Sequence, residues 1–165
     1  MGFRFLQDTQ YATWQHGVMA TYARDCKSTV IPGMRYRDCL AAIEWLCTAL
    51  GFEKHALYMG EGNSVMHSEL TFGNGMIMLG SASNCSEYSK YAAMPGEVGG
   101  RETRSISLIV SDCDAAYAQA KAAGAEMVFE LEEKDYGGKA FTCRDPEGYH
   151  WNVGTYNAWE TTPKA

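Results

Sequence analysis

The chain has 165 residues, of which 46% are apolar and 21% charged, the composition of an ordinary soluble globular protein large enough to bury a core. Its net charge of −6 and the absence of any run of Lys or Arg argue against a nucleic-acid partner or an anionic membrane surface, because phosphates require a concentrated basic face. No apolar stretch approaches the roughly 20 residues that span a bilayer, and the N-terminal part lacks the apolar segment of a signal peptide, so we expect a cytoplasmic protein.

The chain is predicted to begin with an N-terminal extension, residues 1–28, and to end with a polar tail, residues 157–165. Aromatic side chains in the extension suggest a helical arm that packs on the body or on a second subunit, and the alternative is an accessory extension without a functional role. A first module over residues 29–81 opens with a strand at 29–36. Asp38 is placed to cap a helix, because apolar residues recur at helical spacing after it.

Three strands follow in the first module, at about 52–59, 64–72 and 75–81. The Asn-Gly dipeptide at 74–75 is a strong hairpin signal, because both central positions of such a turn must tolerate positive φ. A connecting loop, residues 82–103, leads to the second half. A loop of this length in a compact domain is typically a linker, a lid or a binding loop.

The second module, residues 104–156, repeats this order of elements. A strand near 105–110 precedes a helix that either Asp112 or Asp114 caps. Three more strands follow, and their predicted ranges are 126–131, 138–144 and 149–155.

Each half therefore reads β-α-β-β-β, and the sequence of the first half recurs in degenerate form in the second. The segment Arg37–Ala42 resembles Ser111–Ala116 at a spacing of 74 residues. Such an internal repeat predicts a pseudo-twofold α+β fold with any site within or between equivalent halves. Two later features align at a spacing of 73 instead: the glycines that end the helices, Gly51 and Gly124, and the segments Gly73–Met78 and Pro146–Trp151.

Six cysteines are scattered through the chain without a CxxC pair. Because no export signal is evident, free thiols are predicted in preference to disulfides.

Six short motifs, taken in order and with their double occurrence, carry a resemblance to a known family: Met34–Asp38, Ala41–Leu46, Leu50–Phe52, Asn74–Leu79, Val110–Ala116 and Asp145–Gly148. The chain resembles the vicinal oxygen chelate superfamily, the glyoxalase and bleomycin-resistance group, over residues 29–156. The resemblance implies two tandem modules whose sheets curl around a concave cavity. It also implies a homodimer.

Enzymes of this superfamily typically hold one divalent metal ion through His and Glu side chains on the first and last strands of the modules. Carried over by position, these ligands fall on Ile31, Met78, Ser105 and Asn152. None is a competent ligand for a hard or borderline divalent ion, whereas metal catalysis of this kind needs about three strong protein ligands and an open position. The resemblance thus implies a member without the usual metal site and without a cofactor. Glyoxalase, epimerase, extradiol dioxygenase and fosfomycin-modifying activities are disfavoured.

Alternation along the strands predicts which side chains line the cavity. His55 is predicted to lie outside this lining, whereas Leu70 and Trp151 are predicted to lie in the core. Candidate proton-transfer residues are His67, Glu69 and His150. Predicted ligand-binding residues are Arg35, Met76, Met78, Ser105, Ser107, Thr142, Arg144 and Asn152.

These residues allow more than one interpretation. Arg35 and Arg144 suit a carboxylate or phosphate on a small ligand, or a structural salt bridge to Glu69. His67 and Glu69 form a candidate general acid/base pair or, with His150, an unconventional metal site. Alternatively, they are a charged pair on a solvated sheet face.

The missing metal ligands and the retained concavity favour a metal-independent protein that sequesters or senses a small organic ligand. It would be similar to the bleomycin-resistance branch, with a role in antibiotic resistance. The alternative is an isomerase or lyase of the glyoxalase type that acts on a small carbonyl compound through His67, Glu69 and His150. A third hypothesis is an interaction protein whose extension and connecting loop build a dimer surface.

Overall fold

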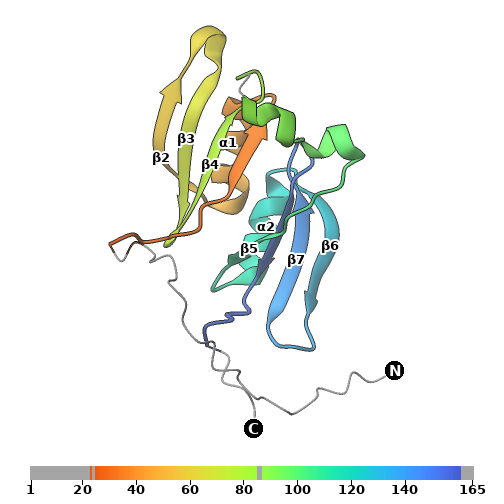
Figure 1. The fold of residues 1–165 in the computed structure, drawn as a ribbon. Coiled ribbons are helices and arrows are strands. Elements are labelled where there is room, and N and C mark those ends of the chain that lie inside the picture. The colour runs from red at the N-terminus through yellow and green to blue at the C-terminus, as the bar shows by residue number, and fades with distance from the viewer. Residues whose placement is uncertain (1–22, 24, 85–86, 161–165) are drawn as a thin grey trace, which may run out of the picture.

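The computed structural model describes residues 23, 25–84 and 87–160, and it contains two four-stranded sheets with one α-helix each (Figure 1). The predicted helical arm lies almost entirely outside the described residues. The first module contains β1 (Gly33–Tyr36), α1 (Cys39–Leu50), β2 (Glu53–Met59), β3 (Val65–Phe72) and β4 (Gly75–Ser81). The second contains β5 (Ile106–Ile109), α2 (Cys113–Ala122), β6 (Glu126–Glu133), β7 (Lys139–Arg144) and β8 (His150–Gly154). The predicted α+β class and the β-α-β-β-β order of both halves are confirmed.

The two sheets have the same topology and the same register. Their strand orders are β1-β4-β3-β2 and β5-β8-β7-β6, with the first two strands of each parallel. Gly33 pairs with Met78 in the first sheet, and Ser107 pairs with Asn152 in the second, so both partners are shifted by 74 residues. β3 and β7 are related by a shift of only 73 residues. The turn between β7 and β8 therefore holds one residue more than the turn between β3 and β4. The predicted spacing of 73 is wrong beyond that turn.

The first strand is shorter than predicted, because it begins at Gly33 and not at residue 29. Pro32 has no N–H to donate to a ladder, and only its carbonyl joins the sheet, where it accepts a hydrogen bond from the Met78 N–H at 2.9 Å. The side chain of Val30 is consequently 80% exposed. Ile31 and Ser105 both precede the strands to which the family alignment assigned them.

Both helices begin at an aspartate whose side chain accepts a hydrogen bond from a backbone N–H three residues later. Asp38 accepts from Ala41 at 3.0 Å, and Asp112 accepts from Ala115 at 2.9 Å, which identifies Asp112 and not Asp114 as the second cap. Gly51 ends α1 in the left-handed conformation, as predicted. Within the described part of the chain, neither helix is long and apolar enough to cross a membrane.

The two modules share one hydrophobic core. Trp151 of β8 is fully buried and meets the Phe52 ring of the first module edge-on, with ring centroids 5.5 Å apart. The indole N–H of Trp45 on α1 donates to the carbonyl of Ala123 after α2 at 3.1 Å. The predicted core positions of Trp151 and Leu70 are confirmed.

A buried carboxylate joins the modules. Asp145, in the turn before β8, is 4% exposed, and its Oδ2 accepts hydrogen bonds from the Tyr36 hydroxyl of β1 at 2.7 Å and the Trp151 indole at 3.2 Å. Its Oδ1 accepts from the backbone N–H groups of Glu147 and Tyr149, both at 3.0 Å. Burial raises the pKa of Asp145, while these hydrogen bonds act in the opposite direction.

The same turn also caps the first module from outside. The carboxylate of Glu147 accepts hydrogen bonds from the backbone N–H groups of Arg37 and Asp38, both at 2.8 Å. These groups precede α1 and have no partner within the helix. The turn therefore holds the end of β1 and the start of α1 against the second module.

Substitution of Asp145 by Asn should lower the free energy of unfolding by about 2–3 kcal/mol. Both carboxylate oxygens face two donors, so either orientation of the new amide directs an N–H group at another donor. Urea denaturation followed by tryptophan fluorescence measures the change. The matched control is Asp135→Asn in an exposed turn. An equal effect of both substitutions would contradict the role of Asp145.

The five described cysteines are free, as predicted: Cys26, Cys39, Cys47, Cys113 and Cys143. Burial raises the pKa of both Cys39 and Cys143 to about 12.

Iodoacetamide at neutral pH should modify the exposed Cys26 first and leave Cys39 and Cys143 intact until the chain unfolds. The thiolate is the reactive species, and both buried sites disfavour it. Peptide mass spectrometry over a time course gives the three rates. Modification of either buried thiol as fast as Cys26 would contradict the described core.

Candidate ligand-binding cavity

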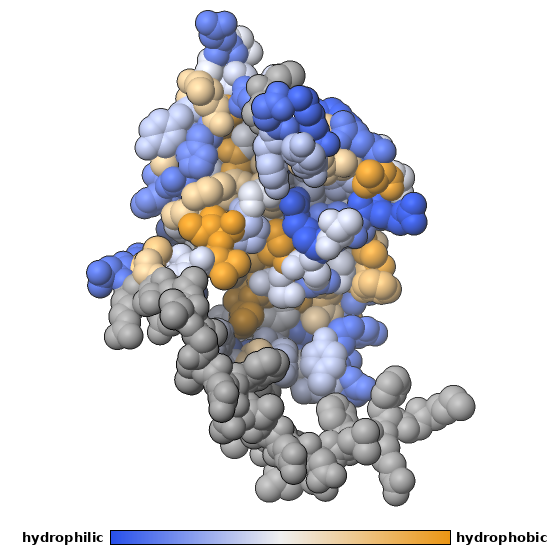
Figure 2. Space-filling model, viewed as in Figure 1, coloured by the Kyte–Doolittle hydropathy of each residue, from blue (hydrophilic) through white to orange (hydrophobic). Residues whose placement is uncertain are grey.

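The outer face of the first sheet forms the floor of a cavity of about 530 Å³. Gly33 and Arg35 of β1, His67 of β3 and Met78 of β4 lie on this floor. The connecting segment, which carries two 3-10 helices, η2 (Glu87–Tyr91) and η3 (Pro95–Val98), lies over it. In the view of Figure 2 the part of this segment around η2 is hydrophilic, whereas apolar side chains gather below it where the modules meet. The second module contributes Arg104 and Tyr149, and the segment contributes these residues to the lining: Ala82, Asn84, Tyr88, Ser89, Ala92, Ala93, Met94 and Glu97.

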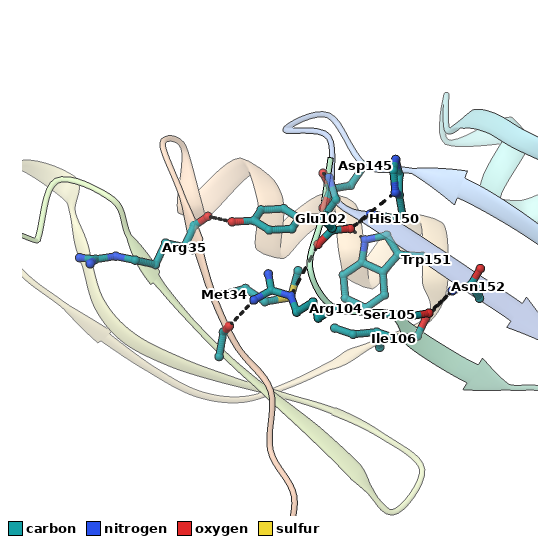
Figure 3. A network of polar contacts seen from close by, with 12 residues as sticks. Met34, Arg35, Glu102, Arg104, Ser105, Ile106, Asp145, His150, Trp151 and Asn152 are labelled. Atoms are coloured by element: carbon teal, nitrogen blue, oxygen red, sulfur yellow. Dashed lines mark hydrogen bonds and ion pairs between the residues drawn. The ribbon is translucent and has the colours of Figure 1, made fainter. Parts of the chain in front are cut away.

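Arg35 is the basic side chain of the floor. One terminal nitrogen, Nη1, donates to the Ser89 hydroxyl at 2.7 Å, and the other donates to the Asn84 carbonyl. Among the described residues, no carboxylate forms an ion pair with Arg35, so the hypothesis of a salt bridge to Glu69 is wrong. Figure 3 shows its side chain directed away from the network around Asp145.

Arg104 lies at the edge of the cavity and is neutralised within the chain. Its guanidinium donates to the Gly33 carbonyl at 3.0 Å and lies 3.6 Å from a carboxylate oxygen of Glu102 (Figure 3). It also lies over the ring of Tyr149, 5.0 Å from the centroid. The Tyr149 hydroxyl in turn donates to the Arg35 carbonyl at 2.7 Å. This chain of contacts connects the floor of the cavity to the second module.

Glu69 lies beside the floor between two histidines. Its Oε1 is 3.1 Å from His67 Nε2, and its Oε2 is 3.7 Å from His55 Nε2. His55 lies outside the cavity lining, as predicted, but its contact with Glu69 was not predicted, because the register shifts between Lys54 and Ala56. Such an irregularity re-aims one side chain of a strand and brings His55 to Glu69.

The equivalent face of the second sheet is covered by hydrogen bonds between its own side chains. Thr142 donates to the side-chain oxygen of Asn152 at 2.8 Å, and the amide nitrogen of Asn152 donates to the Ser105 hydroxyl at 2.8 Å. Arg144 pairs with Glu126 at 2.9 Å and not with Glu69.

His150 belongs to this second face. Its Nε2 accepts a hydrogen bond from Arg144 at 3.2 Å, and its backbone N–H donates to Glu102 at 2.6 Å. The structure therefore brings His67 and Glu69 together and leaves His150 with other partners. The unconventional metal site of these three residues is not assembled.

The predicted binding residues are distributed over three places. Arg35 and Met78 line the large cavity, whereas Met76 and Ser107 line a smaller, mainly apolar cavity of about 290 Å³ between the modules. The polar face of the second sheet carries the remaining four: Ser105, Thr142, Arg144 and Asn152.

The sequence patterns missed the lining residues that come from the connecting segment, such as Met94, and also Met66 of β3 and Arg104 of the second module. For the lining residues of the connecting segment, the only signal in the sequence was the unusual length of that loop.

Comparisons with known proteins agree with this architecture. The sequence profile of the Glyoxalase/Bleomycin resistance protein/Dioxygenase superfamily matches residues 29–153. The chain belongs to this superfamily. Among solved structures, this member is similar to TioX from Micromonospora sp. ML1, with a TM-score of 0.61 and 26% identity over 79% of this chain and 99% of that one. A superfamily member from Sphaerobacter thermophilus is similar in fold, with a TM-score of 0.54 and 21% identity over 76% and 95% of the two chains. The uncharacterised protein Rv0887c of Mycobacterium tuberculosis is 27% identical over 81% of this chain and 78% of its own length.

The metal ion common in this superfamily does not fit the residues at the corresponding positions. Asn152 is bonded to Thr142 and Ser105, Met78 is a soft thioether, and Ile31 has no donor atom. Elsewhere in the described ranges, no three His, Cys, Asp or Glu side chains are grouped so as to hold a metal ion.

Proposed function

We propose that this superfamily member binds a small organic molecule in the cavity of the first module, without a metal ion, and so sequesters or senses it. The observation that carries the proposal is the cavity itself. Its volume of about 530 Å³ falls within the range of about 300–1,000 Å³ that small-molecule sites occupy. A homodimer and a role in antibiotic resistance, expected from the resemblance, belong to the same proposal, as does the cytoplasmic location expected from the N-terminal sequence.

The composition of the lining supports binding. Met66, Met78 and Met94 provide flexible, polarisable surface that adapts to ligands of irregular shape. Gly33 leaves room, because a Cβ placed there has no described atom within 4 Å. Arg35 supplies a polar group that can fix the orientation of a ligand.

One contact favours a second candidate function, an isomerase or lyase that acts on a small carbonyl compound. His67 lines the cavity, and Glu69 lies within hydrogen-bonding distance of its imidazole, as a proton-transfer pair requires. His150, which was predicted to complete the set, is engaged with Arg144 on the other sheet.

Substitution of Gly33 by Leu should abolish binding in the cavity. The new side chain shares the face of Arg35 and enters open space, so the melting temperature should stay close to that of the wild type. A chemically broad panel of small organic acids, amides and amines is first screened by calorimetry to find compounds that bind below about 1 mM, a free energy of about −4 kcal/mol.

Ala118→Leu on the exposed face of α2 is the matched control and should leave binding unchanged. The proposal fails if no compound in the panel binds the wild type below about 1 mM. It also fails if Gly33→Leu binds every compound as well as the wild type does.

The second candidate predicts that Glu69→Gln lowers turnover of a small carbonyl compound such as methylglyoxal by about 100-fold, because the His67 imidazole loses its anionic partner. Turnover is followed by absorbance, and the melting temperature is measured in parallel. Glu61→Gln, in the exposed turn between β2 and β3, is the control and should keep full activity. Unchanged turnover in Glu69→Gln would remove the pair from any mechanism.

A further inference from the structure

We infer that the ligand of this cavity is a small monoanionic carboxylate with an apolar body, and that its carboxylate pairs with Arg35. The inference rests on the proposed function and assigns its ligand class. Three observations lead to it: the state of the Arg35 guanidinium, the net charge of the lining and an apolar part of the wall formed by methionines and alanines.

The guanidinium of Arg35 is partly buried and is oriented without an anionic partner. Ser89 and the Asn84 carbonyl each accept from one terminal nitrogen. A guanidinium has five N–H groups, so these two contacts leave one N–H on each terminal nitrogen for a further acceptor. Neutral acceptors orient a cation but do not neutralise it, and a partly desolvated cation gains most from a carboxylate in fork geometry.

The other charges around the cavity limit the ligand to one negative charge. Arg104 is already compensated by Glu102 and by the ring of Tyr149. The carboxylate of Glu97, which also lines the cavity, accepts a hydrogen bond from the Met94 N–H at 2.8 Å and adds negative charge at the edge. A dianion such as a phosphate monoester would face one uncompensated arginine and a repelling carboxylate. A monoanion is neutralised by Arg35 alone.

One apolar part of the lining suits an apolar body, although polar residues such as His67, Ser81 and Tyr88 also line the cavity. Met66, Met78 and Met94 contribute thioether surface, and the alanines at 82, 92 and 93 add small apolar side chains. None of these side chains offers a strong hydrogen-bond partner to a polar body, so hydroxyl or amide groups there would lose their hydration without replacement. An aromatic or branched aliphatic carboxylate meets both demands.

The test uses the full chain and three probes that share a naphthalene ring and differ only in the polar group: naphthoate, naphthamide and naphthyl phosphate. Isothermal titration calorimetry gives their affinities. Naphthoate should bind at least about tenfold more tightly than naphthamide, because a charge-assisted contact replaces a neutral one. Naphthyl phosphate should bind more weakly than naphthoate. Gly33→Leu should eliminate all three signals.

Arg35→Gln separates the charge of Arg35 from its role in holding the connecting segment. Loss of its contacts to Ser89 and Asn84 would weaken the binding of naphthoate and of naphthamide equally. Loss of the charge would instead lower the ratio of naphthoate affinity to naphthamide affinity toward one. We expect the ratio to fall, and Arg35→Lys, which keeps the charge, to restore part of it. Arg37→Gln removes the same charge outside the cavity lining and should keep the wild-type ratio.

Equal affinity for naphthoate and naphthamide in the wild type would overturn the assignment of an anion while leaving small-molecule binding intact. A ratio that survives in Arg35→Gln would overturn the role of Arg35. Tighter binding of naphthyl phosphate would overturn the limit to one charge. Failure of all three probes to bind below about 1 mM would overturn the naphthalene-sized carboxylate as the ligand class. The proposed function itself fails only if the wider panel also finds no ligand.

Discussion

Asp145 is a buried carboxylate that accepts four hydrogen bonds, one from the first module and three from its own. Replacing any donor would leave a charged group buried with fewer partners, so this arrangement fixes β1 against the turn before β8. The Tyr36 hydroxyl supplies the contact from β1, and the adjacent residue of that strand is Arg35. The site that we assign to ligand binding is therefore positioned by a contact between the modules.

The position of β1 determines the rest of the cavity. Tyr149 reaches the Arg35 carbonyl, and Arg104 reaches the Gly33 carbonyl while it stays paired with Glu102. Arg104 is neutralised by Glu102, whereas no described carboxylate pairs with Arg35 on the floor of the cavity. The electrostatic character of the cavity thus depends on the pairing of Arg104, a lining residue, with Glu102, which does not line the cavity.

The two modules differ at the positions that line the cavity of the first module. The modules keep the same register, yet the outward-facing residues differ at equivalent positions: Gly33 corresponds to Ser107, Arg35 to Ile109 and Met78 to Asn152. The connecting segment contributes to the wall of the first module's cavity. On the second sheet, Asn152 bonds to Thr142 and Ser105 and so satisfies polar groups that a ligand would otherwise engage.

Local patterns in the sequence predicted the elements, the helix caps and the alternation of buried residues, because period-two and helical periodicities act within a few neighbouring residues. They failed where a tertiary contact or an irregular strand decides the outcome. The register shift at His55 leaves no clear trace in the residue types. The partners of Arg35 and Arg144 depend on segments distant in sequence, and the role of the connecting segment was visible only as an unusual length. The residue types at the aligned ligand positions, by contrast, are read directly from the sequence, and the expectation that no metal ion binds there stays a prediction.

Native mass spectrometry of the full chain, purified without chelator and without metal-affinity resin, tests the central claim most directly. We expect the wild type to retain an organic adduct that Gly33→Leu lacks, with no stoichiometric divalent ion in either protein. One divalent ion per chain, retained by both proteins, would contradict metal-independent binding in the cavity of the first module.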